Sequence, residues 1–153
     1  MHFNIIQLDT GKIPRNERIT NFSLCDDTLL ARKSDYVDDP IPYDEDLHKV
    51  IKHELSPFAT VCRKKRTVTF RDRETVMKNL AKHIDRVFRK FKKESKKGRV
   101  NYWSLVNELE GGTGADLIYI NGYCHRLYDV LEDYLKGYLP KELHIGGIIS
   151  AHI

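Results

Sequence analysis

The stretch from Asp72 to Gly98 most constrains the fold, because it has the pattern of one long amphipathic helix. Asp72 can cap its start and Gly98 can end it. Its apolar residues recur at the spacing of one helical face, at Val76, Leu80, Ile84, Val87, Phe88 and Phe91. We predict that this face, Phe88 included, packs on the core. Glu94 falls on the same side, so the last turns are expected to project.

The opposite face of this predicted helix is almost entirely basic. It carries Lys78, Lys82, Arg86, Arg89, Lys93 and Lys96, with Asp85 beside them. Residues 63–99 as a whole hold 16 of the 26 Lys and Arg but only 4 of the 22 Asp and Glu, a local charge of +12 against −8 for the rest of the chain. A block of this kind creates a positive field whatever the overall balance is.

Shorter patterns predict the other elements. Strands are expected over 3–8, 58–63, 67–70 and 143–153, with a further possible strand over 28–31, helices over 45–55 and 102–110, and a loop over 33–43. The two strands on either side of residues 64–66 are interpreted as a hairpin.

The segment from Thr113 to Tyr138 has two interpretations. Thr113 with Asp116 resembles a capping box, which favours one helix through to Tyr138. The alternative is a strand over 116–120, a turn at Asn121-Gly122 and a helix from 123.

These elements predict one α+β domain over residues 1–153, with a small, mostly antiparallel sheet covered by three or four helices. The three cysteines, Cys25, Cys62 and Cys124, are an odd and widely spaced set. We interpret them as reduced core residues of a cytoplasmic protein. The chain has no run of 18 apolar residues and no leader-like start, so neither a membrane span nor a signal peptide is expected.

The basic block is the candidate binding site. Its predicted residues are Arg63, Lys64, Lys65 and Arg66 at the hairpin tip, Lys82, Arg86, Arg89 and Lys93 on the helix, and Trp103. We expect the tip and the helix row to form one continuous surface that holds a polyanion, most simply RNA or DNA. Phosphate contacts of this kind bind without sequence preference, and Trp103 with Tyr102 could stack on bases.

Two other functions stay open. The same block, or the aromatic face around Tyr119, Tyr123 and Tyr134, could bind an acidic protein, as in an inhibitor or adaptor. A small metal-independent nuclease is the third hypothesis, with His83 assisted by Tyr102 or Arg86. The chain has no recognisable nucleophile or base motif, so a small binding or regulatory protein is favoured over an enzyme.

No cofactor or metal is expected. The acidic residues Asp35, Asp38, Asp39, Asp44, Glu45 and Asp46 lack the spacing of a calcium loop and are interpreted as a solvated loop and a helix start, or as a surface facing the basic block. The histidines and cysteines lack zinc-site spacing. Residues Gly111–Gly114 lack the other residues of a phosphate loop and are interpreted as a turn.

Overall fold

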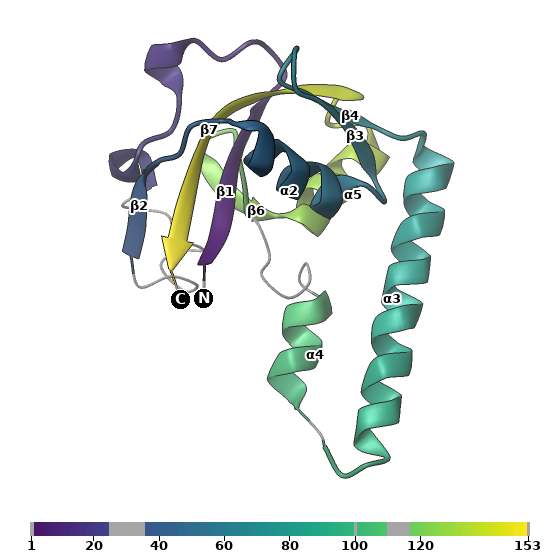
Figure 1. The fold of residues 1–153 in the computed structure, drawn as a ribbon. Coiled ribbons are helices and arrows are strands. Elements are labelled where there is room, and N and C mark those ends of the chain that lie inside the picture. Colours follow the sequence, from purple (N-terminus) through teal and green to yellow (C-terminus); the bar gives the residue numbers. More distant parts are fainter. Residues whose placement is uncertain (1, 25–35, 100, 110–116, 153) are drawn as a thin grey trace.

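The structure, a computed structural model, describes residues 2–24, 36–99, 101–109 and 117–152 (Figure 1). Its strands are β1 (His2–Asp9), β2 (Tyr36–Pro40), β3 (Ala59–Cys62), β4 (Thr67–Phe70), β5 (Leu117–Ile120), β6 (Tyr123–Arg126) and β7 (Glu142–His152). Its α-helices are α2 (Glu45–Leu55), α3 (Arg73–Ser95), α4 (Tyr102–Leu109) and α5 (Leu127–Lys136), and two short 3-10 helices are η1 (Arg15–Glu17) and η2 (Asn21–Leu24). The α+β class is confirmed.

The strands form one seven-stranded mixed sheet in the order β3-β4-β7-β1-β5-β6, with β2 also paired to β7. The first and last strands therefore lie side by side at its centre. Strand β7 is antiparallel to β1, β2 and β4, whereas β1 runs parallel to β5. The sheet is thus mainly antiparallel, as expected, with a parallel pair inside it.

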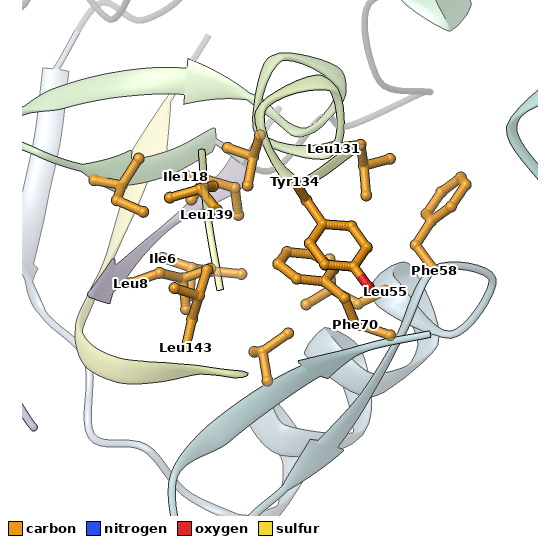
Figure 2. Close-up of a cluster of buried hydrophobic side chains, with 14 of the residues drawn as sticks. Ile6, Leu8, Leu55, Phe58, Phe70, Ile118, Leu131, Tyr134, Leu139 and Leu143 are labelled. Carbon is orange, nitrogen blue, oxygen red and sulfur yellow. The ribbon is translucent and has the colours of Figure 1, made fainter. Parts of the chain in front are cut away.

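The core lies on both faces of the sheet. Successive strand residues point to opposite faces, so Ile5 and Ile6 belong to different clusters. On the larger side, α2, α5 and the first turn of α3 cover Ile6 and its neighbours, and the rings of Phe70 and Tyr134 stack with centroids 4.6 Å apart (Figure 2). On the other side, the segment with η1 and η2 contributes Ile19 and Leu24.

Helices α2 and α3 begin at the aspartates that their sequences indicate. The carboxylate of Asp44 accepts a hydrogen bond from the backbone amide of Leu47 at 2.9 Å, and that of Asp72 accepts one from Thr75 at 2.8 Å. Val76, in the first turn of α3, belongs to the core. Beyond it the helix runs away from the sheet beside α4 (Figure 1). We call α3 from Met77 onward, together with α4, the helical arm.

The predicted core face of the long helix is partly wrong. Val87 is buried, but the side chains of Ile84 and Phe88 are 38% and 52% exposed. The reason is geometric: the arm leaves the sheet soon after Val76, so its outer half has the single short helix α4 to pack against and buries a narrower strip. The expectation that three or four helices cover the sheet is confirmed in outline, because α2, α5 and the first turn of α3 pack on it, whereas the rest of α3 does not.

Two other expectations need correction, and one open alternative is decided. The loop predicted over 33–43 contains strand β2, in which Tyr36 pairs with His152, so edge pairing overrides low strand propensity. For the segment after residue 116, the alternative of a strand, a turn and a helix is confirmed. The helix, α5, begins at Leu127 and not at residue 123, because residues 123–126 form strand β6 and pair with β5. Cys62 is exposed and only Cys124 is buried, whereas both were expected in the core. The strand predicted over 28–31, Thr113 and Cys25 lie outside the described residues.

Candidate anion-binding surfaces

The predicted basic residues lie in two separate regions. In Figure 1 the turn between β3 and β4 lies at the top, and the far end of α3 lies at the bottom. Strand β4 leads from the turn to Phe70, and α3 starts just after it and continues away from the sheet. The single continuous surface expected from the sequence is therefore wrong, and each region is described by itself.

The helical arm carries the first region. Lys82, Arg86, Arg89 and Lys93 are all exposed on α3. Arg89 pairs with Asp85, and the guanidinium of Arg86 donates a hydrogen bond to Nδ1 of His83 at 2.9 Å. Lys82 and Lys93 make no ion pair with any residue in the described part of the chain. Their charges are therefore available to a ligand.

The helical arm also carries exposed aromatic side chains. Trp103 and Tyr102, at the start of α4, are 72% and 65% exposed, and their ring centroids lie 5.9 Å apart at an interplanar angle of 71°. Phe88 is exposed on α3 of the same arm. Large aromatic surfaces left in water are a feature of binding sites rather than of helix ends.

A groove of about 200 Å³ lies between α3 and α4, lined by Val87, Lys90, Phe91, Glu94, Arg99, Asn101 and Leu105. Val87, Phe91 and Leu105 form the apolar part of its lining, and the charged lining residues are Lys90, Glu94 and Arg99. Lys97 pairs with Glu94 at 3.2 Å, which neutralises the one acidic residue among the described lining residues. The arm thus combines positive charge with a small apolar groove.

His83, the histidine of the nuclease hypothesis, lies half-buried between α3 and α5. Its ring centroid is 5.8 Å from that of Tyr128. A guanidinium can only donate, so the bond from Arg86 occupies Nδ1 of His83 as an acceptor. Burial raises the pKa of Tyr128, and the charge of Arg86 opposes that rise. Arg86 and Tyr102 were the two residues predicted to assist His83. Arg86 contacts it, whereas Tyr102 is exposed on α4.

The second basic region is the end of the β3–β4 hairpin. Lys64 and Lys65 are exposed in the turn, and Arg63 lies 3.8 Å from a carboxylate oxygen of Glu45. Arg66 differs from them because it turns inward. Its guanidinium donates a hydrogen bond to the carbonyl of Gly146 and lies over the ring of Tyr43, 4.9 Å from the centroid.

Arg66 enters a gap in strand pairing along β7. On one edge, β7 pairs with β4 up to the Thr67–His144 pair and with β2 from the Pro40–Ile149 pair onward. Gly146 and Gly147 lie between these two pairings. On the other edge they form a bulge, because the register moves from Leu8–Ile145 to Ile6–Ile148 and leaves Gln7 opposite both glycines.

Gln7 connects this bulge to the segment before η2. Its side-chain oxygen accepts hydrogen bonds from Gly147 at 2.8 Å and Ile19 at 2.9 Å, and its amide donates to the carbonyl of Glu17 at 3.0 Å. Arg18 lies between the two residues that Gln7 holds. A buried glutamine therefore places an arginine from outside the basic block next to Arg66.

The result is a pocket of about 240 Å³ at the gap, in which Arg15, Arg18 and Arg66 are the charged lining residues. A neighbouring depression shares Arg18 and Arg66 and adds Lys12, Lys65 and His144. Neither Arg15 nor Arg18 is among the binding residues that the sequence predicts. Their spacing along the sequence does not relate them to Arg66. The pair Gly146-Gly147 was the one local indication that other residues pack closely against the backbone here.

The part of the acidic stretch from Asp44 to Asp46 has structural partners. Asp44 caps α2, and Glu45 and Asp46 lie 3.5 Å and 3.4 Å from the ammonium of Lys49. The described residues contain no group of three or more His, Cys, Asp or Glu that could hold a metal ion. Residues 111–114 lie outside the described part. Among the helices described, none has the length and apolar character that a membrane span needs.

Comparisons with protein-family models, curated proteins and solved structures found no match to this chain. Its function is therefore inferred from the two basic regions themselves.

Proposed function

We propose that the helical arm binds a polyanion, most simply single-stranded RNA or DNA, by its phosphate backbone. The observation that carries this proposal is the exposed basic row of α3 together with the exposed rings of Trp103 and Tyr102 on α4. Residues three or four apart on a helix are about 5–6 Å apart, which is near the spacing of successive phosphates along a strand. Bases beside such a backbone can stack on the rings.

A fluorescence anisotropy titration of a labelled single-stranded RNA, at about 50 mM and about 200 mM salt, tests the proposal. The variant with both Lys82→Ala and Lys93→Ala removes the two lysines of the basic row, neither of which has an ion-pair partner among the described residues. Each phosphate contact to a single strand adds about 0.7 to the slope of log affinity against log salt, so we expect the slope to fall by about 1.4. The loss should be similar for every sequence.

The matched control carries Lys49→Ala and Lys136→Ala, which also removes two exposed lysines but from α2 and α5. Its salt slope should equal that of the wild type. Trp103→Ala should weaken binding by about 1–3 kcal/mol at both salt concentrations while the slope stays unchanged, because stacking releases no counterions. Absence of any binding at about 50 mM salt contradicts the proposal.

An acidic protein partner is the second candidate. The observation that favours it is an apolar row along one flank of α3, where Met77, Ile84 and Phe88 are all exposed. Aliphatic residues contribute little to base stacking but much to a protein interface. A poly-glutamate peptide that displaces the RNA and binds more tightly at the same salt concentration would favour this candidate over nucleic acid.

A further inference from the structure

The pocket at Gly146–Gly147 concentrates positive charge. Arg15, Arg18 and Arg66 line it, and none of the described residues that line it is an Asp or Glu. None of the three forms an ion pair with the described part of the chain. Burial lowers the pKa of Arg66, and the charge of Arg18 lowers it further, so the two guanidinium groups repel each other. An anion between them would relieve this repulsion.

Two arginines that line the pocket each have a side-chain donor without an acceptor among the described residues. These donors are the Nε atoms of Arg18 and Arg66, and both atoms are buried. Buried donors are normally paired, and an unpaired one is costly. The side chain of Arg66 is held in place by the carbonyl of Gly146 and the ring of Tyr43, and the bonds of Gln7 fix the backbone on either side of Arg18. This part of the pocket is therefore organised before any ligand binds.

We infer that this pocket binds the phosphate group of a small phosphorylated molecule. The planar guanidinium group can donate two hydrogen bonds to the oxygens of one phosphate. Three arginines suit the double negative charge of a phosphate group better than the single charge of a carboxylate. A volume of about 240 Å³ is below the range of about 300–1,000 Å³ of clefts that hold drug-sized ligands. It suits the phosphate itself, with the rest of the ligand directed outward. This site is separate from the helical arm.

The test is a titration with inorganic phosphate and with ribose 5-phosphate, followed through the arginine Nε–H signals in ¹⁵N–¹H spectra of the whole chain. We expect saturable shifts of the Arg18 and Arg66 signals and none of the Arg89 signal on the arm. Arg15→Gln and Arg18→Gln should each weaken binding about tenfold or more, as expected for a lost bond to a charged group. Both leave the Arg66–Gly146 bond in place.

Lys136→Gln is the matched control, because it removes one exposed charge from α5 and should leave the phosphate affinity unchanged. Absence of saturable shifts, or equal shifts with acetate, would contradict the inference. A 5′-phosphorylated oligonucleotide that binds the pocket more tightly than ribose 5-phosphate would place a nucleic-acid end there instead of a small molecule. The variant with Lys82→Ala and Lys93→Ala should keep its phosphate affinity, so failure at the arm and failure at the pocket are distinguishable.

Discussion

The guanidinium of Arg66 lies over the ring of Tyr43, with its central carbon 4.9 Å from the ring centroid. This contact joins the β3–β4 turn to the segment that leads from β2 into α2. The hydroxyl of Tyr43 is in turn 2.7 Å from Nδ1 of His48 on α2. Tyr43 lines the pocket at Gly146–Gly147, so this side of the pocket depends on the linked contacts of Arg66, Tyr43 and His48.

The stability of this region should depend on pH through His48. Burial lowers the pKa of His48 below its ordinary value of 6.5, and Lys52 and Arg63 lower it further. The unfolded chain then binds the proton more readily than the folded one, so the free energy of unfolding should fall as the pH drops below 6.5 toward the folded pKa. Urea melts of the wild type and of His48→Gln at several pH values measure this, and an identical pH profile for the two would contradict it.

Gly146 should not tolerate a side chain. A Cβ atom there would lie 2.6 Å from Cδ1 of Ile13 and would overlap the side-chain oxygen of Gln7. Gly146→Ala should therefore lower the free energy of unfolding by about 1–3 kcal/mol, the usual cost of overpacking. Gly11→Ala is the control, because nothing lies within 4 Å of a Cβ atom at Gly11. Equal denaturation midpoints for the two variants would show that the bulge is not tightly packed.

Neighbouring residues of α3 should differ in their effect on stability. Val87 is 2% exposed and Phe88 is 52% exposed. Val87→Ala should cost about 1–3 kcal/mol as a core truncation, whereas Phe88→Ala should cost less than about 1 kcal/mol although it removes a larger side chain. Denaturant melts compare them directly. The reverse order would mean that the core face of the arm is assigned wrongly.

The two described cysteines should differ in reactivity. Cys62 is exposed at the end of β3, and Cys124 is buried in β6. Because a thiol must be accessible to react, iodoacetamide should label Cys62 in the folded protein and Cys124 only in denaturant. Peptide mass spectrometry after timed labelling gives the two rates. Labelling of Cys124 at a rate similar to that of Cys62 in native conditions would contradict the burial in β6.

Features that depend on neighbouring residues were predictable from the sequence. The apolar spacing and the capping aspartates located α2 and α3, and residues 64–66 marked the hairpin turn, because such signals act within a few residues of the chain. The concentration of basic residues in 63–99 likewise needed no structure.

Only the tertiary structure decided which of these residues meet. It sent α3 away from the sheet, which exposed Phe88 and separated the arm from the hairpin turn. It also brought Arg18 to Arg66 through the bulge at Gly146–Gly147 and the hydrogen bonds of Gln7. Contacts between residues so distant along the chain leave no periodic pattern in the sequence, since they depend on strand register and on the packing of several elements at once.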